Sequence, residues 1–282
     1  MSMSAPVPSL LRSPTSRPSY DVANGRVARE LQVASALPIR RESAHFRSLR
    51  GSGKSALLKV TWIDAVPRDR IAFPQSRTHP DVVFMHDNMP TTLVDWLRTY
   101  FLNAVEAGER FSSGETIQLG WMLVALRQDA EGSLALWEPD FRSIPIVWTE
   151  GIDTTLRHLS LQRAVCAALN ASPVFPSIRD SAVVSTGFIE NGNTFVMTRD
   201  EPVGNDSGWL FRKQLDVVAG ASRRSVFEIA LRQYDVVPFV ALPPGARVSR
   251  TEHEIEIELG TVRASSKTNE FLAKLASNRP AD

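Results

Sequence analysis

The sequence is poor in cysteine and has no long hydrophobic run, and each absence narrows the class of protein. Cys166 is the single cysteine among 282 residues, so neither an internal disulfide nor a cage of thiolate metal ligands can form. One cysteine also fits a reducing compartment. No stretch approaches the roughly 18 consecutive apolar residues of a membrane-spanning helix, and the N-terminal end lacks the apolar core of a secretory signal. We therefore expect a soluble, cytoplasmic protein that does not bind membranes.

Net charge is nearly absent as well, at +1, but the two parts of the chain differ in sign. Residues 1–54 carry nine Lys or Arg and three Asp or Glu, a balance of +6, which leaves −5 for residues 55–282. The first segment is rich in Ser, Pro and Arg and shows no hydrophobic period, so we predict a disordered basic tail over 1–54. The acidic body disfavours nucleic acid as a partner and favours a basic protein surface.

The remainder of the chain alternates strand and helix patterns, which predicts an α+β fold of two small domains. Each domain is expected to contain a mainly antiparallel sheet with one or two packed helices. The boundary is expected at Ser172–Pro176, where two prolines in four residues end a helix and favour an extended linker. This divides the chain into an N-terminal domain over 55–172, a C-terminal domain over 173–265 and a polar tail over 266–282, in which a helix is left open as an alternative.

Hydrophobic periodicity locates the expected elements of the N-terminal domain. The clearest is a helix from Pro90 to about Ala107, whose apolar residues recur at helical spacing until Gly108. A stretch that is apolar on both alternating sets predicts one central strand over 116–127, joined to its neighbour by a hairpin. The other expected elements are strands over 56–63, 81–86 and 134–141 and a helix from Thr154 or Thr155 to about Ala171.

The C-terminal domain is expected to begin with a hairpin whose turn contains Asn191 and Gly192, between strands over 181–185 and 194–199. Further expected elements are a strand over 209–211, a helix over 222–234, a buried strand over 236–242 and a strand over 254–259. The last alternates Glu with aliphatic residues, which predicts a row of outward carboxylates about 20 Å long at Glu252, Glu254, Glu256 and Glu258. Such a row either forms a solvated face or receives a basic partner.

Two motifs leave an enzyme as an alternative. Gly53, Lys54 and Ser55 resemble the end of a phosphate-binding loop, but the first glycine, the preceding strand and the following helix of that motif are missing. His79 and His86 lie near two aspartates, yet on an extended strand they do not converge on one metal ion. A nucleotide-dependent hydrolase using Lys54, or a metal hydrolase using His79 and His86, is therefore kept as an alternative only.

No other residues form a coherent catalytic set. Cys166 and His158 lie eight residues apart on one expected helix, about 12 Å along its axis, which is too far for a hydrogen-bonded pair. Cys166 instead falls on the apolar stripe, as a core residue would. Glu138 and Asp140 share one face of a strand, but nothing indicates a substrate between them. We therefore predict no catalytic residue, no bound metal and no cofactor.

The tetrad Asp206-Ser207-Gly208-Trp209 follows an Arg-acid-acid-Pro stretch at Arg199. With this tetrad as the most specific element, the segment from Ala182 to Pro244 is similar to a bacterial immunity-protein domain, the thirty-third family of the polymorphic-toxin immunity series. A strand at 183–185 and a late segment at 236–240 also match. Relatives differ after Trp209, where this chain has Leu-Phe-Arg-Lys-Gln. The resemblance implies a cytoplasmic bacterial protein that binds and neutralises a cognate toxin, such as a type VI secretion effector.

The tetrad also has a physical interpretation. Asp206 can accept backbone N–H bonds in an Asx turn, Gly208 can take a positive φ, and Trp209 can then enter a strand. This gives a structural motif of Asp206, Ser207, Gly208, Trp209 and Pro238. The alternative is a partner-binding surface, since Trp and Arg are enriched among interface hot spots. Its candidate residues, together with those of the carboxylate row, are Arg199, Asp200, Glu201, Asp206, Trp209, Glu252, Glu254 and Glu256.

The sequence thus predicts a stoichiometric inhibitor of a protein toxin rather than an enzyme. A regulatory or scaffold protein that uses the same fold is a further alternative, because fold does not determine function.

Overall fold

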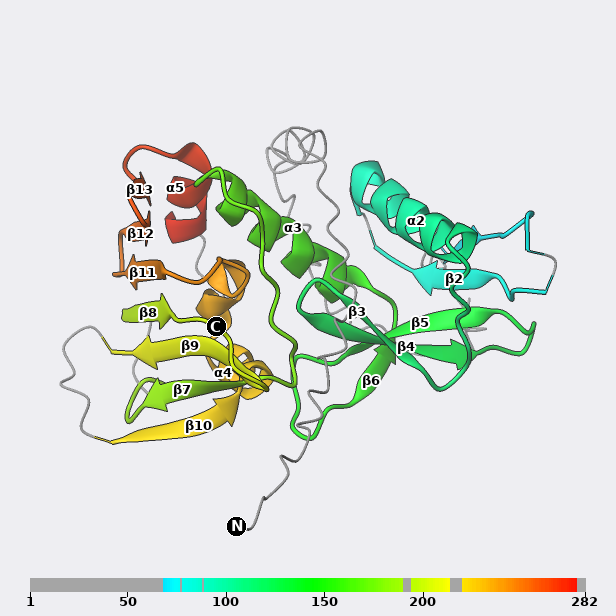
Figure 1. The fold of residues 1–282 in the computed structure, drawn as a ribbon, viewed down its shortest axis with the longest axis horizontal. Helices are drawn as coiled ribbons and strands as arrows, with labels where there is room; N and C mark the ends of the chain where they lie inside the picture. Colours follow the sequence, from blue (N-terminus) through cyan, green and yellow to red (C-terminus); the bar gives the residue numbers. More distant parts are fainter. Residues whose placement is uncertain (1–67, 77, 88, 190–193, 214–219, 278–282) are drawn as a thin grey trace, which may run out of the picture.

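The computed structural model describes residues 68–76, 78–87, 89–189, 194–213 and 220–277. Two mixed β-sheets are connected by helix α3 (Asp153–Ala167), which crosses between them (Figure 1). This α+β architecture confirms the predicted fold class. The expected basic tail, the strand over 56–63 and the motif at Lys54 lie outside the described residues.

The first sheet has six strands in the order β1-β2-β5-β4-β3, with β6 paired to β5. Only the β2–β5 pair is parallel. Helix α2 (Thr91–Glu106) packs its apolar stripe against this sheet, as the sequence predicts. The strands are β1 (Arg68–Ile71), β2 (Val82–Met85), β3 (Thr116–Leu119), β4 (Met122–Gln128), β5 (Leu134–Pro139) and β6 (Trp148–Glu150).

The stretch over 116–127 forms two strands, so the prediction of one central strand is wrong. The chain reverses at Gly120, whose φ of +63° is readily adopted only by glycine, and β3 and β4 pair antiparallel. Both strands bury apolar residues, which explains why the sequence shows no break in hydrophobicity across the turn. The predicted hairpin between β4 and β5 is confirmed.

The second sheet has seven strands in the order β10-β7-β9-β8-β11-β12-β13. All neighbouring strands pair antiparallel except β7 and β9, which are parallel. Its strands are β7 (Ser181–Ser185), β8 (Phe195–Arg199), β9 (Asp206–Arg212), β10 (Ala221–Ser225), β11 (Ala246–Arg250), β12 (Ile255–Leu259) and β13 (Val262–Ser265). The helical elements are α4 (Val226–Arg232), the 3₁₀ helix η1 (Tyr234–Phe239) and α5 (Glu270–Ser277).

Three sequence predictions for this sheet are wrong. β7 and β8 do not form a hairpin, because β9 lies between them and pairs with both. The expected helix over 222–234 begins as strand β10, which pairs with β7, and only its second half is helical. The expected strand over 236–242 is instead η1 and the turn after it, although it is as buried as predicted.

The C-terminal segment expected to be a polar tail contains helix α5. Leu272 on this helix is fully buried, and Phe271 and Leu275 pack partly against the core of the second sheet. The amphipathic pattern is short, which explains why composition alone suggested a tail. Residues 270–277 therefore complete the core beside β12 and β13.

Helix α3 joins the cores of the two sheets. Leu156 near its start packs in the core of the first sheet, whereas Val165 and Cys166 near its end pack in the core of the second. The buried carboxylate of Glu138 accepts hydrogen bonds from the backbone N–H groups of Thr154 and Thr155, at 3.0 and 2.7 Å. Glu138 thus caps α3, although it lies on another element of the fold.

Candidate functional site

The tetrad Asp206-Ser207-Gly208-Trp209 opens β9 as an irregular strand. Asp206 accepts a hydrogen bond from the N–H of Gly208 at 2.9 Å, which is the Asx turn that the sequence indicates. The pairing with β7 then shifts: Ser181 lies opposite Asp206, but Val183 lies opposite Leu210. Four residues of β9 therefore span a stretch that β7 covers in two, and this bulge bends the strand.

Arg199, at the end of β8, is buried beside this bulge. Its side chain is 2% exposed and donates hydrogen bonds to the carbonyl oxygens of Ser207, Val174, Val240 and Leu242, at 3.1, 2.6, 3.3 and 2.5 Å. Burial lowers the pKa of Arg199 to about 10, so the guanidinium is still charged at neutral pH. The four carbonyl dipoles therefore replace the water that this cation loses.

Trp209 is 1% exposed and lies against the same centre. Its indole N–H donates to the carbonyl of Val240 at 2.9 Å, and the guanidinium of Arg199 lies 5.4 Å from its ring. The expectation that Arg199 and Trp209 offer side chains to a partner is therefore a mistake: both are enclosed by their own chain. Pro238, within η1, is also buried. These residues fix the end of the sheet instead.

The loop that follows Arg199 is exposed. Asp200 and Glu201 face solvent, and Val203 is 74% exposed at its tip. The loop is nevertheless held in place, because the N–H of Asp200 donates to Gly208 and Val203 pairs with Asp206 across a tight turn. We call residues 200–205 the tetrad loop. It presents two carboxylates and one aliphatic side chain on a fixed backbone.

The predicted alternation along β12 is confirmed, since Ile255 and Ile257 are fully buried and Glu256 is exposed. The carboxylates are nevertheless not a continuous acidic surface. Lys267 lies 2.7 Å from Glu254, and Arg263 lies 3.2 Å from Glu258. Glu252 and Glu256 are exposed, and Glu256 has serines opposite it on both neighbouring strands.

The two predicted acidic sets lie at opposite ends of the second sheet. β8 and β11 are antiparallel, and Phe195 at the start of β8 pairs with Arg250 at the end of β11. Glu252 follows Arg250, whereas Asp200 follows the other end of β8. Strands of this length separate their ends by about 16 Å. The carboxylates therefore do not form one site.

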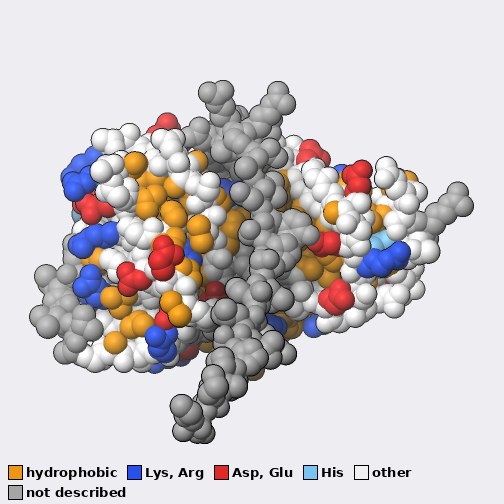
Figure 2. Space-filling view, in the orientation of Figure 1, with side chains coloured by type: hydrophobic (Ala, Val, Ile, Leu, Met, Phe, Trp, Pro, Cys, Tyr) orange, Lys and Arg blue, Asp and Glu red, His pale blue; other side chains and the backbone are white. Residues whose placement is uncertain are grey.

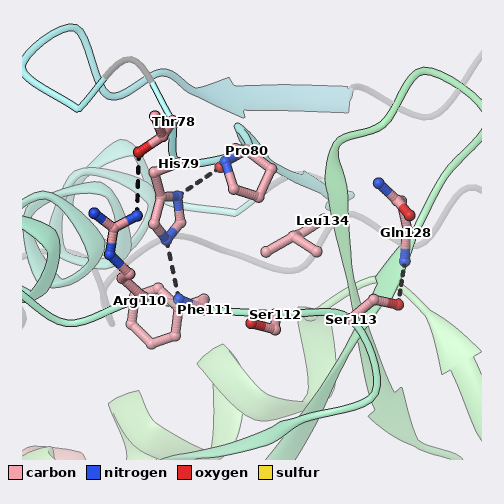
Figure 3. Close-up of a pocket in the computed structure, with 9 residues that line it drawn as sticks. All are labelled: Thr78, His79, Pro80, Arg110, Phe111, Ser112, Ser113, Gln128 and Leu134. Atoms are coloured by element: carbon pink, nitrogen blue, oxygen red, sulfur yellow. Dashed lines mark hydrogen bonds between the residues drawn. The ribbon is translucent and has the colours of Figure 1, made fainter.

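The histidines proposed for a metal site have structural partners. His79 is buried, with Nδ1 2.7 Å from the carbonyl of Pro80 and Nε2 accepting the N–H of Phe111 at 3.0 Å (Figure 3). The shallow cavity of about 280 Å³ beside it is lined by Arg110, by hydroxyl and amide side chains and by apolar groups, and no carboxylate lines it. His86 lies 3.7 Å from Asp69. Within the described ranges no group of three or more His, Cys, Asp or Glu could hold a metal ion.

The other residues weighed for catalysis are engaged elsewhere. Burial raises the pKa of the Cys166 thiol to about 12, so it is not a nucleophile at neutral pH. Asp140 pairs with Arg142, and Glu138 caps α3. These side chains are accounted for by the fold.

His158 has a role that the sequence did not reveal, at the junction of the two sheets. It is fully buried; its Nδ1 lies 3.3 Å from the indole nitrogen of Trp121 and its Nε2 lies 2.9 Å from the hydroxyl of Tyr234. An indole N–H is only a donor, so Nδ1 accepts and Nε2 carries the proton. Phe141 and Phe227 complete an aromatic cluster that joins the turn between β3 and β4, the segment after β5, α3, α4 and η1.

This burial predicts a loss of stability in mild acid. Desolvation lowers the pKa of His158 to about 3, against 6.5 for an exposed histidine. As the pH falls, His158 is therefore protonated in the unfolded chain before it is protonated in the folded protein. Between pH 6.5 and about 3 this proton uptake stabilises the unfolded chain increasingly. The free energy of unfolding should fall by up to about 1.4 kcal/mol per pH unit in this window.

Urea unfolding at pH 7, 6 and 5 measures this slope. In His158→Gln the part of the slope due to this residue should be absent, while other groups act equally in both proteins. Glu138, whose pKa burial raises, acts in the opposite direction, so the difference between the two proteins is the informative quantity. Equal slopes in the two proteins would show that His158 is not neutral in the folded state.

Comparison with known protein families finds one similarity, in the C-terminal part of the chain. The matching family is described as the Imm33-like domain, and its model covers residues 161–259. The match begins within α3 and ends with β12, so it includes the tetrad, Arg199 and six strands of the second sheet. It confirms the resemblance drawn from the sequence over 182–244. No curated protein and no solved structure matches the chain.

In the described part of the chain, no helix combines the length and apolar character required to cross a bilayer.

Proposed function

We propose that this protein is an immunity protein that binds a cognate bacterial toxin and neutralises it by stoichiometric inhibition. The observation that carries the proposal is the Imm33-like match over residues 161–259. We further propose that the protein is cytoplasmic, that it acts without catalysis or a cofactor, and that its partner is an effector of a polymorphic system such as type VI secretion. Inhibition then requires only a surface that covers the toxin's working site.

The tetrad loop and the exposed glutamates at the far end of the sheet are the proposed acidic contacts. Asp200 and Glu201 at one end, and Glu252 and Glu256 towards the other, suit basic side chains of a partner. Asp206 contributes less directly, because it is already paired with Arg223. Glu254 is likewise neutralised by Lys267. The fixed backbone of the tetrad loop favours binding, because little conformational freedom is lost there.

Co-expression with effector domains encoded beside the gene tests the function. The wild-type protein should restore growth to cells that produce its cognate toxin and should co-purify with it at a fixed stoichiometry. Failure to protect against any neighbouring effector would refute the proposal. Protection without a stable complex would instead indicate an enzyme that acts on the toxin or its product.

Charge reversal at the tetrad loop should weaken that complex. The double change Asp200→Lys and Glu201→Lys replaces two exposed carboxylates, so the dissociation constant should rise at least tenfold without loss of folding. Glu106→Lys is the matched control: it reverses an exposed carboxylate on α2, outside the matched domain. Titration calorimetry with a catalytically inactivated effector measures both. Equal effects of the two charge reversals would contradict a role for the loop.

A further inference from the structure

We infer that the toxin docks across the outer face of the seven-stranded sheet and places carboxylates against Arg212 and Arg247. The inference rests on the proposed function and adds the contact face and the chemistry of the partner. It also differs from the sequence-based expectation, which assigned the toxin only basic side chains.

The helices that the structure describes pack against one face of the second sheet. Inward residues such as Val184, Met197 and Val248 pack in one core with α3, α4, η1 and α5. The alternate residues Val183, Thr198 and Arg247 are absent from that core, and no described helix lies over them. In Figure 2, hydrophobic side chains and charges of both signs are interspersed on the C-terminal unit at the left. Arg247 on this face is exposed, Val183 and Thr198 are partly exposed, and Val196 is buried, so the side chains within reach of a partner are the first three.

The strand registers define the row of outward side chains that crosses this face. Val183 on β7 lies opposite Leu210 on β9, which lies opposite Thr198 on β8. The row begins with Arg223 beside Val183 and continues from Thr198 to Arg247. An apolar centre is thus bordered by two arginines. This composition resembles an interface core, in which aliphatic burial is combined with Arg hot spots.

The second row places another arginine on the same face. Arg212 lies opposite Val196, and Val196 lies opposite Ser249 on β11. The Nε of Arg212 is shielded from solvent and has no hydrogen-bond partner. The Arg212 side chain as a whole is partly exposed, so a carboxylate of the partner can pair with its charge there.

The arginines of this face differ in the partners that they already have. Arg223 pairs with Asp206, and Arg263 lies 3.2 Å from Glu258. Within the described ranges, Arg212 and Arg247 form no ion pair within 4.0 Å. They flank β8, two strand spacings apart and two residues out of line along the strands, which places their Cα atoms about 12 Å from each other. A partner with two carboxylates at that spacing, next to an aliphatic side chain over Leu210, would match the face.

The face supplies a large part of the area that a stable complex needs. Seven strands span about 29 Å, and the strand length adds about 16 Å, with the tetrad loop beyond one end and Glu252 beyond the other. A standard interface buries about 800 Å² on each partner, which is more than these dimensions provide, so contacts at the two ends would have to add to it. One partner lying across the face would therefore reach both acidic ends, which no smaller contact at a single end can do.

Three variants test this contact on the full chain, with a catalytically inactivated effector domain encoded beside the gene as the probe. Arg247→Glu and Leu210→Asp should each raise the dissociation constant at least tenfold. Arg247→Lys should raise it less, because lysine keeps the positive charge. Arg110→Glu, an exposed arginine outside the matched domain, is the control and should change nothing. Unchanged melting temperatures exclude misfolding.

The outcomes separate this inference from the proposed function. A wild-type complex that Arg247→Glu and Leu210→Asp leave intact overturns the docking face, while the immunity function stands. If binding is lost only in the tetrad-loop variant, the docking face is likewise overturned and the immunity function stands. A homodimer that Arg247→Glu dissociates would assign the face to a second copy and also overturn the inference, as would displacement of the effector by RNA. If the wild-type protein neither binds any neighbouring effector nor protects cells against one, both proposals are refuted.

Discussion

Replacing Arg199 by methionine should lower the free energy of unfolding by about 3–5 kcal/mol, one of the two largest effects expected for this protein. Methionine fills a similar volume but donates no hydrogen bond. The carbonyl groups of Ser207, Val174, Val240 and Leu242 would then lose the donor that the guanidinium provides. Val240 keeps the indole N–H of Trp209 as a donor, but each of the other buried acceptors left without one costs about 1–3 kcal/mol, and partial rearrangement reduces the sum.

Urea unfolding of Arg199→Met, Arg199→Lys and the wild type measures this effect. Lysine keeps the charge but has no planar guanidinium that reaches several carbonyls. The free energy of unfolding of Arg199→Lys should therefore lie between those of Arg199→Met and the wild type. Arg247→Met is the control, because Arg247 is exposed and its replacement should change stability by less than about 0.5 kcal/mol. A loss below about 1 kcal/mol in Arg199→Met would show that the four hydrogen bonds contribute little.

The same substitution should affect binding indirectly. Arg199 connects the segment at Val174, the residues after η1 and the start of β9, so it sets the position of the tetrad loop without touching a partner. This is why an arginine that looks like an interface residue in the sequence is better described as a support for one. Asp200, the next residue, is exposed and is the one that can meet a partner.

Sequence reasoning succeeded where a local pattern determines the structure. The apolar stripe of α2 and the alternation of β12 are set by residues a few positions apart, and both were predicted correctly. Both elements have one face in a core and one in solvent, so the hydrophobic period is directly visible.

Sequence reasoning failed where strand pairing between distant segments determines the structure. Nothing near β7 indicates that β9 rather than β8 is its neighbour, because that pairing closes a loop of more than 20 residues. β10 has the composition of a helix start and becomes a strand only because the edge of β7 is available. η1 is as apolar as a buried strand, and periodicity does not distinguish the two.

In the candidate site, too, the features set by neighbouring residues could be predicted and those set by distant contacts could not. The Asx turn at Asp206 and the positive φ of Gly208 follow from residue type and spacing. The burial of Arg199 and Trp209 does not, because their partners at Val174 and Val240 are distant in sequence. The outer face could not be predicted either, since its rows exist only once the registers of seven strands are known.

Gly208 gives the second large effect. Its φ of +78° lies in the region that side chains disfavour, and a Cβ at this position would overlap the carbonyl oxygen of Asp200. That carbonyl belongs to backbone held by Arg199 and by the hydrogen bond from the N–H of Asp200 to Gly208, so it cannot move away easily. Gly208→Ala should therefore reduce the free energy of unfolding by about 3 kcal/mol or more.

Gly204→Ala is the matched control for this prediction. Gly204 lies in the same loop with a φ of +61°, but a Cβ there would meet no atom within 4 Å. It should cost only the backbone strain of about 1–2 kcal/mol. Thermal and urea unfolding of the two variants separates the backbone strain from the steric overlap with Asp200. The strain is common to both variants, whereas the overlap occurs only in Gly208→Ala. If Gly208→Ala is no less stable than Gly204→Ala, the bulge of β9 tolerates a side chain, and the tetrad is not fixed by the approach of Asp200.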